Sequence, residues 1–236
     1  MQKLLTIVIP CKNEEKYIAR TLYAITTQKG INNTKIIIAD ANSTDDTLKI
    51  INEIKNQLNI DLDVIKGGSP SVGRNLGAKL TKTPYILFLD ADVTFTKPNA
   101  IKKALRLLTS HKYDMVSTTP VYLGEKDWKA SFIFWINKWI TIVLSYKKPF
   151  AIGGFTMVCK NLFDKLGGYN EKVTQSEDWI FSKQVNPKKF KIIPDLMTQD
   201  NRRFKKYGYW KMIKLIWINW INRNNIEHFY KDQNYF

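Results

Sequence analysis

Residues 85–92 read YILFLDAD, an apolar run that ends at two aspartates, Asp90 and Asp92. Five consecutive apolar residues of this kind predict a buried strand of a parallel sheet. Two acids one residue apart at a strand end can direct oxygens into the cleft above the sheet, where Mg²⁺ or Mn²⁺ would be held against a diphosphate. Acids in this position can also form turns or cap helices, so the motif alone leaves the function open.

Similar runs precede this strand and alternate with helical patterns. The expected strands are residues 4–9, 35–39 and 62–65, and the expected helices are residues 14–27, 47–58 and 73–80. Strands that alternate with helices indicate βαβ units, and hence an α/β fold with a mainly parallel, Rossmann-like sheet. Ligands of such sheets bind beyond the carboxyl ends of the strands, which is where Asp40 and Asp90 fall.

The second half of the chain has a less regular pattern. Its expected strands are residues 115–119 and 150–159, and its expected helices are residues 128–146, 161–166, 176–185 and 209–222. Neither an internal repeat nor a clear linker divides the 236 residues, so we expect a single domain.

A second acidic motif, Ser176-Glu177-Asp178-Trp179, lies in this half. A carboxylate in a partly desolvated pocket is suited to take a proton from an acceptor hydroxyl. The alternative is that Glu177 and Asp178 only favour the amino end of a helix through its dipole. The motif therefore offers a candidate base without establishing one.

The chain carries 37 Lys and Arg against 21 Asp and Glu, a formal net charge of +16. Such a charge attracts nucleic acid, an anionic membrane or phosphorylated small molecules, although a Lys-rich solvated surface gives the same count.

Cys11 and Cys159 lack metal-ligand spacing, and we expect free thiols in a reducing compartment. No apolar stretch reaches the roughly 18–20 residues of a membrane span, and the first residues do not form a signal-peptide pattern. A cytoplasmic protein, soluble or peripheral at the cytoplasmic membrane face, is expected.

Six segments in the same order and spacing resemble family 2 glycosyltransferases of the GT-A fold. The segments are TIVIPCKNEEKYI, IIIADANSTDDT, VGRNLGA, YILFLDADV, FAIGGFTMVCKNLFDKLGGYNE and SEDW, and they extend over most of the chain. The resemblance implies a nucleotide-sugar-binding half at residues 1–119, an acceptor-side half at residues 120–208, and a C-terminal amphipathic helix and tail at residues 209–236.

The resemblance also implies a role for individual residues. The donor-binding residues would be Pro10, Lys12, Asn13, Glu14, Asp40, Arg74, Asp90, Arg202 and Arg203. Asp92 would ligate Mg²⁺ or Mn²⁺, Asp178 would be the base of an inverting single displacement, and Glu177 would assist in positioning. The donor would be a UDP- or GDP-sugar, and the acceptor a hydroxyl or phosphate of a glycan, lipid or protein.

One motif departs from the pattern of the processive members. They carry Q-x-x-R-W, whereas this chain reads Gln199-Asp200-Asn201-Arg202-Arg203. The segment 202–208 (RRFKKYG) instead resembles the R-R-W-x-x-x-G segment of small non-processive relatives. Either arginine could bind a diphosphate because a planar guanidinium fits phosphate oxygens; a solvated basic loop is the alternative.

Two aromatic segments raise the question of a membrane. In residues 209–222, one helical face carries Trp210, Ile213, Trp217, Trp220 and Ile221. Residues 128–146 have a similar composition. Trp and Lys around an apolar stripe are typical of an interfacial helix on an anionic membrane. Such a stripe can equally cover the domain's own core or form a homodimer interface.

Three other functions compete with transfer. An inactive relative would bind nucleotide without turnover, but the set of Asp40, Asp90, Asp92 and Asp178 is intact. A sugar-nucleotide pyrophosphorylase would carry a Gly-rich loop ending in Thr-Arg after the first strand, which is not the sequence here. No zinc-finger or RNA-recognition signature supports a nucleic-acid-binding domain, so we expect no nucleic-acid partner.

Overall fold

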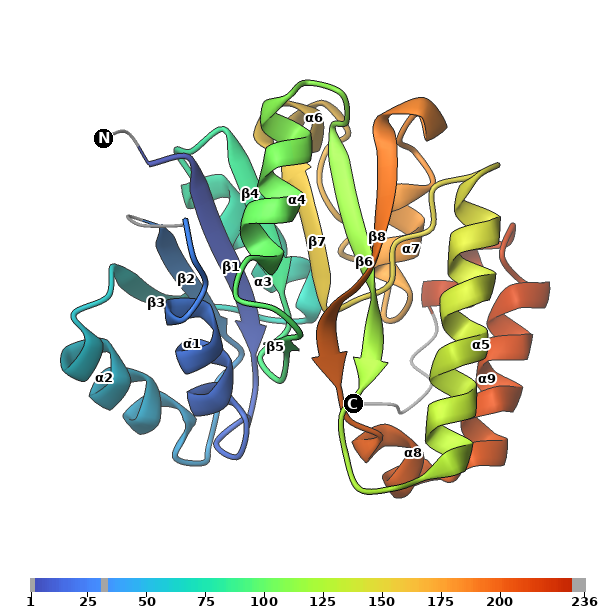
Figure 1. Ribbon diagram of the computed structural model, residues 1–236, viewed down its shortest axis with the longest axis horizontal. Coiled ribbons are helices and arrows are strands. Elements are labelled where there is room, and N and C mark those ends of the chain that lie inside the picture. The colour runs from blue at the N-terminus through green and yellow to red at the C-terminus, as the bar shows by residue number, and fades with distance from the viewer. Residues whose placement is uncertain (1–2, 31–33, 231–236) are drawn as a thin grey trace.

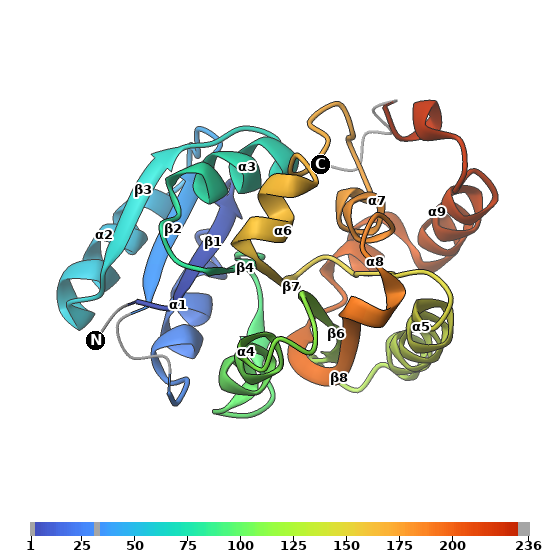
Figure 2. The same cartoon turned by 90° about the horizontal axis from the view of Figure 1, so that it is seen from above.

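A computed structural model describes residues 3–30 and 34–230. Within these residues, eight strands form one sheet that is covered by helices on both faces (Figures 1 and 2). The strands are β1 (Leu5–Cys11), β2 (Lys35–Asp40), β3 (Leu62–Lys66), β4 (Tyr85–Leu89), β5 (Thr94–Phe95), β6 (Met115–Tyr122), β7 (Phe155–Cys159) and β8 (Phe190–Gln199). Their order across the sheet is β3-β2-β1-β4-β7-β6-β8-β5.

The sheet is parallel in its first half and mixed in its second. Strands β3, β2, β1 and β4 pair in parallel, as the alternating pattern predicted. Strand β7 runs antiparallel to both β4 and β6, whereas β8 is parallel to β6. The short β5 pairs antiparallel with β8 at the edge. The α/β fold with a mainly parallel sheet is confirmed, with the antiparallel strand inserted next to β4.

Helices and short 3₁₀ turns connect the strands. The α-helices are α1 (Ile18–Thr26), α2 (Thr47–Leu58), α3 (Pro70–Leu80), α4 (Ala100–Thr109), α5 (Trp128–Ser145), α6 (Lys160–Lys165), α7 (Glu177–Ser182), α8 (Arg202–Tyr207) and α9 (Tyr209–Ile221). The 3₁₀ turns are η1 (Pro187–Lys189) and η2 (Ile226–Tyr230). None of the helices in the described part is long and apolar enough to cross a bilayer.

Alternate side chains of the central strands form two core layers. On one face, Ile7 and Leu87 pack with side chains from α1, α2 and α4. On the other face, Val8, Ile37 and Phe88 pack with side chains from α3, α6 and α7. Because successive residues of a strand point to opposite faces, a strand buried on both sides is apolar throughout, which explains the uninterrupted runs in the sequence.

A glycine brings α3 close to β1. A Cβ atom on Gly77 would lie 2.3 Å from Cγ1 of Val8, which is closer than real contacts allow. The close approach fixes the position of Arg74, which lies one turn earlier on the same helix. The sequence placed the start of this helix at residue 73, but it begins at Pro70, directly after Ser69. Proline suits the first turn because the amide hydrogen that it lacks has no partner there.

Several other boundaries differ from the prediction. Helix α1 begins at Ile18 and not at residue 14, because residues 14–17 form a turn whose carbonyl at Glu14 accepts from the amides of Tyr17 and Ile18. Strand β7 begins at Phe155 and not at residue 150, after the glycine pair 153–154. Elements β5, α4, β8 and α8 were not predicted at all. Both cysteines are free thiols.

Candidate active site

The candidate site lies at the carboxyl edge of the parallel strands. The end of β2 provides Asp40, and the loop after β4 provides Asp90 and Asp92. The loop after β1 contributes Glu14, and α7 begins with Glu177 and Asp178. Parallel strands end at the same edge, so acids distant in sequence come close together.

One buried arginine joins three of the predicted carboxylates. Arg74 is 2% exposed and donates from Nη2 to Oδ1 of Asp90 at 2.8 Å and from Nη1 to Oε1 of Glu177 at 2.5 Å. Its Nη2 also lies 3.6 Å from Oδ2 of Asp178. The guanidinium lies over the ring of Tyr169, 5.4 Å from the centroid. The surrounding carboxylates raise the pKa of Arg74, against the effect of burial, so this cation stays charged and holds the acids in place.

Asp178 occupies an environment suited to a base. Its Oδ1 accepts a hydrogen bond of 3.0 Å from the hydroxyl of Tyr169. Its Oδ2 faces Gly153, where a Cβ would come within 3.0 Å of that oxygen. Burial raises the pKa of Asp178 to about 7; Arg74 and the Tyr169 hydroxyl lower it, and Glu177 and Asp90 raise it further. A carboxylate whose pKa is near neutrality is both present as the base and able to take a proton.

A second arginine joins the first loop to the DAD motif. Arg202, at the start of α8, forms two hydrogen bonds with the carboxylate of Glu14, at 2.8 and 3.0 Å. Its Nη2 also lies 2.8 Å from Oδ2 of Asp92, and its guanidinium stacks over Tyr17 at 4.6 Å. The planar guanidinium of an arginine can bind the oxygens of a carboxylate or of a phosphate with two hydrogen bonds. Arg203 is exposed beside it, and its charge acts on Asp92.

Asp92, the predicted metal ligand, is buried near two further acids, Asp90 and Glu14. It is 4% exposed, and burial raises its pKa to about 6, with Asp90 and Glu14 adding to the rise and Arg202 opposing it. Among the described residues, no group of three or more potential metal ligands is found. Asp90 and Asp92 supply the carboxylate oxygens that Mg²⁺ and Mn²⁺ prefer, and the remaining ligands would have to be diphosphate and water oxygens. On donor chemistry the residues fit such an ion.

The other predicted donor residues lie at or directly after the ends of β1 and β2. Asp40 accepts hydrogen bonds from the amide of Ser43 at 3.0 Å and from its hydroxyl at 2.5 Å. Asn13 has a φ of +53° and accepts a bond of 2.8 Å from the amide of Thr44, which locks the first loop against the second. Lys12 is exposed, and Pro10 is half-buried at the end of β1.

The sequence interpretation missed two aromatic residues of the site. Tyr169 orients Asp178 and covers Arg74, and Tyr17 supports Arg202. Tyr169 follows the glycine pair 167–168, both at positive φ, and the amide of Tyr169 donates to Oδ1 of Asn75 at 2.9 Å. The LGGYN segment was visible in the sequence, but only the fold shows that it turns back toward α3.

Residues 6–167, more than half of the chain, match the model of the family described as "Glycosyl transferase family 2". The chain is 25% identical over 235 residues to the processive diacylglycerol beta-glycosyltransferase of Mycoplasma genitalium, and the match covers 95% of this chain and 64% of that protein. It is 28% identical over 114 residues to the poly(ribitol-phosphate) beta-N-acetylglucosaminyltransferase TarS of Staphylococcus aureus, covering 47% of this chain and 20% of TarS.

Solved structures share the fold at low sequence identity. TarS residues 1–349 in complex with UDP-GlcNAc match with a TM-score of 0.64 and 17% identity, covering 84% of this chain and 58% of that one. The mannosyltransferase PcManGT of Pyrobaculum calidifontis, in complex with GDP-Man and Mn²⁺, matches with a TM-score of 0.67 and 17% identity, covering 82% of this chain and 55% of that one. The chain thus spans about a fifth to two thirds of the length of these relatives.

Proposed function

The chain belongs to glycosyl transferase family 2, and from this premise we propose that it transfers a sugar from a nucleotide-diphosphate donor to an acceptor hydroxyl or phosphate. The resemblance to this family and the GT-A fold that the motifs predicted are confirmed. The observation that carries the proposed reaction is the carboxylate of Asp178. It is buried, it is held by the Tyr169 hydroxyl, and it lies near Asp90, which directly follows β4.

The donor is a UDP- or GDP-sugar in this proposal. Structural neighbours hold UDP-GlcNAc in one case and GDP-Man with Mn²⁺ in another, which supports a donor of this class. We assign the nucleoside and sugar of the donor mainly to residues 1–119 and the acceptor mainly to residues 120–208. Asp40 and the loop of Lys12, Asn13 and Glu14 would hold the nucleoside, and Asp90 the ribose or sugar. Arg202 and Arg203 would bind the diphosphate.

The transfer is a single displacement with inversion. Asp178 takes the proton of the acceptor hydroxyl on Oδ2, the oxygen that faces Gly153. The acceptor oxygen bonds to the anomeric carbon as the bond from that carbon to the diphosphate breaks, and the nucleoside diphosphate leaves with the electron pair. The Tyr169 hydroxyl keeps the carboxylate in position, since it holds the opposite oxygen. Glu177 positions the acceptor or the sugar.

The diphosphate leaves with additional negative charge, which the site must neutralise. Asp92, with Asp90 beside it, would hold Mg²⁺ or Mn²⁺, and the ion would act as a Lewis acid on the diphosphate oxygens. Arg202 adds a guanidinium on the same side, because it already contacts Asp92 and Glu14.

The role proposed for Arg74 differs from the one predicted from the sequence. A contact with the donor was predicted, but the two terminal nitrogens of Arg74 donate hydrogen bonds to Asp90 and Glu177. We therefore assign Arg74 to positioning the carboxylates.

Two substitutions of an aspartate by asparagine, which has nearly the same shape, separate the roles of the aspartates. Asp178→Asn should lower the rate of transfer by about 10²–10⁴-fold, because the base is lost, while nucleotide binding stays nearly unchanged. Asp92→Asn should weaken Mn²⁺-dependent nucleotide binding by at least about tenfold. The measurements are turnover of the donor and the thermal shift produced by UDP, GDP, CDP and dTDP with and without Mn²⁺, since a ligand that binds the folded state stabilises it.

Asp164→Asn is the matched control. Asp164 pairs with Lys160 on the exposed side of α6, away from the site, so this variant should behave as wild type. Normal turnover in Asp178→Asn would contradict its role as the base. A protein that binds nucleotide but never turns over any donor would instead be the inactive relative.

A further inference from the structure

Helix α5 presents its apolar stripe outward. Only Ala130 and Thr141 of its 18 residues are buried. Large apolar side chains recur every three or four residues on the exposed face. They are Trp128, Phe132, Trp135, Trp139, Val143 and, directly after the helix, Tyr146. A stripe with this spacing normally faces a core, and here it faces away from the protein.

Helix α9 has the same arrangement. None of its side chains is buried. The face predicted from the sequence, with Trp210, Ile213, Trp217, Trp220 and Ile221, is the exposed face, and Trp210 is 86% exposed. The alternative that this face covers the domain's own core is therefore wrong. Six of the chain's seven tryptophans lie exposed on these two helices, Trp179 being the exception.

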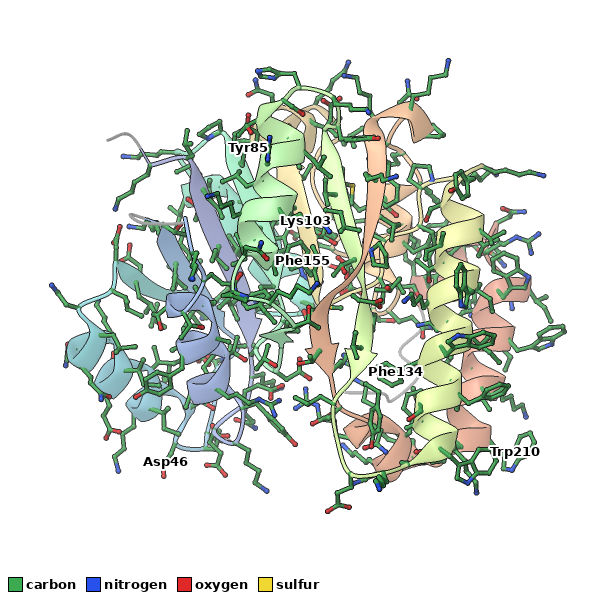
Figure 3. The ribbon with its side chains drawn as sticks, in the orientation of Figure 1. Asp46, Tyr85, Lys103, Phe134, Phe155 and Trp210 are labelled. Atoms are coloured by element: carbon green, nitrogen blue, oxygen red, sulfur yellow. The ribbon has the colours of Figure 1, made fainter. Side chains whose placement is uncertain are left out.

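The two helices lie at the same end of the molecule, where they overlap in the view of Figure 1 and stand apart when seen from above in Figure 2. Their first residues are joined through Asp127, which accepts from Nδ2 of Asn201 at 2.8 Å and from the hydroxyl of Tyr209. Trp210 projects outward from the lower end of α9, whereas Phe134 points inward from α5 (Figure 3), where it packs against Phe204. Both helices thus expose large apolar side chains at this end of the molecule, and we call these exposed side chains together the aromatic face.

The two segments that carry the aromatic face contain basic residues and no acids, although Asp127 joins their first residues and Asp195 pairs with Lys138. Residues 128–150 contain Lys129, Lys138, Lys147 and Lys148 and no acid. Residues 201–226 contain no acid either. Their seven basic residues are Arg202, Arg203, Lys205, Lys206, Lys211, Lys214 and Arg223. Of the eleven, Lys138 pairs with Asp195, and Arg202 lies in the active site.

We propose that the aromatic face docks on an anionic lipid bilayer. Tryptophan at the level of the headgroups with lysine beside it is the chemistry of an interfacial helix, and each basic residue near an anionic surface adds to binding. A second copy of the chain fits less well. A twofold dimer would place the same patch on both sides, so that Lys211, Lys214 and Arg223 would face like charges across the interface.

The docked orientation has a consequence for the acceptor, which rests on the proposed function. Arg202 begins α8, which leads directly into α9, and Arg202 also contacts Glu14 and Asp92. Docking would therefore hold the diphosphate side of the site close to the headgroups. An acceptor carried by a lipid could then reach Asp178 without leaving the bilayer.

The test is flotation of the full chain with vesicles. Wild type should float with vesicles of equal parts phosphatidylglycerol and phosphatidylcholine, and at least tenfold less with phosphatidylcholine alone. Raising NaCl from about 0.05 M to about 0.5 M should weaken the binding, because the charges are screened. Tryptophan emission should shift to the blue on binding, since the indoles enter an apolar layer.

Two pairs of substitutions with matched controls locate the surface. Trp210→Ser/Trp217→Ser and Lys211→Glu/Lys214→Glu should each reduce vesicle binding by about tenfold or more. Leu76→Ser/Leu80→Ser on α3 and Lys102→Glu/Lys103→Glu on α4 remove exposed apolar groups and reverse charges elsewhere, and should leave binding unchanged. Thermal melting confirms that each variant is folded.

Three results would overturn the proposal. These are failure of wild type to float, equal flotation with both vesicle types, and a dimer by light scattering that Trp210→Ser/Trp217→Ser dissociates. The nucleotide-induced thermal shift, measured on the same samples, reports the donor site independently. A wild-type protein that shows the nucleotide-induced shift but does not bind vesicles would reject the membrane surface and leave the proposed transferase function standing.

Discussion

The raised pKa of Asp178 suits its proposed role as a base, but it lowers the stability of the folded protein near neutral pH. It is 4% exposed, and burial with the neighbouring Glu177 and Asp90 raises its pKa from the ordinary 3.8 to about 7. The folded protein thus binds a proton at Asp178 between about pH 4 and pH 7, whereas the unfolded chain has released it. Stability from this group is complete below the unfolded pKa and is lost as the pH rises through the folded pKa.

Asp178→Asn removes this titration, and the effect has a predictable sign. Between pH 5 and pH 8 the free energy of unfolding of the wild type should fall by about 1–3 kcal/mol relative to that of the variant. Each pH unit between the unfolded and the folded pKa of Asp178 corresponds to about 1.4 kcal/mol. Urea unfolding of both proteins at several pH values measures this difference. Asp164→Asn should follow the wild-type curve, and parallel curves for Asp178→Asn and wild type would show that Asp178 does not titrate in this range.

The candidate acids could be found from the sequence, but their partners could not. The apolar run that ends in the DAD motif indicates Asp90 and Asp92, and the SEDW segment indicates Asp178. The same reasoning could not show that Arg74 lies within 3 Å of acids 16 and 103 residues away. Which residue neutralises a buried charge depends on tertiary contacts, and no local pattern encodes them.

At the scale of one element, the position of α3 depends on the absence of a side chain at Gly77. An added Cβ would lie 2.3 Å from Cγ1 of Val8, so the helix would have to move away from β1. Gly77→Ala should lower the free energy of unfolding by about 1–3 kcal/mol, despite the better helix propensity of alanine. Chemical denaturation measures this loss.

A double-mutant cycle separates crowding from other effects. Val8→Ala removes the two methyl groups that a new Cβ would meet, so the combination with Gly77→Ala should cost less than the sum of the single substitutions. Additive losses would indicate that Gly77 is needed for another reason.

The helix α4 and the strand β8 were not predicted from the sequence, for different reasons. In α4, Ile101, Ala104, Leu105 and Leu108 have helical spacing and are buried, so this helix could have been predicted. In β8, Pro194 and Asp195 interrupt the strand pattern, and Asp195 has a φ of +62° where the register with β6 shifts. Such irregular strands resemble loops in sequence.

At the scale of the whole molecule, stability should be distributed unevenly. Strands β1 and β4 consist almost entirely of buried residues, whereas α9 has none and α5 has two. Amide hydrogen exchange should therefore be fastest in the described helices at residues 209–221 and 128–145, and slowest in the central strands. Mass spectrometry of exchanged peptides measures the gradient, and protection of α9 equal to that of β4 would contradict it.

The overall architecture was the part most readily predicted. Apolar runs alternate with helical spacing through residue 89, and these runs are the parallel half of the sheet. The second half was harder because its strands do not follow a repeating order: β7 enters antiparallel between β4 and β6. A strand's neighbours there are set by packing against the sheet already formed.

The bond between Arg202 and Glu14 joins residues 188 positions apart. A ribosome adds about 5–20 residues each second and allows domains to fold as they emerge. A nascent chain with its parallel strands already assembled would still lack Arg202, so Glu14 and Asp92 would repel each other and an anionic donor as well. We therefore expect a chain that ends before Arg202 to bind nucleotide sugar more weakly than the full chain, which titration of both with the nucleotide would measure.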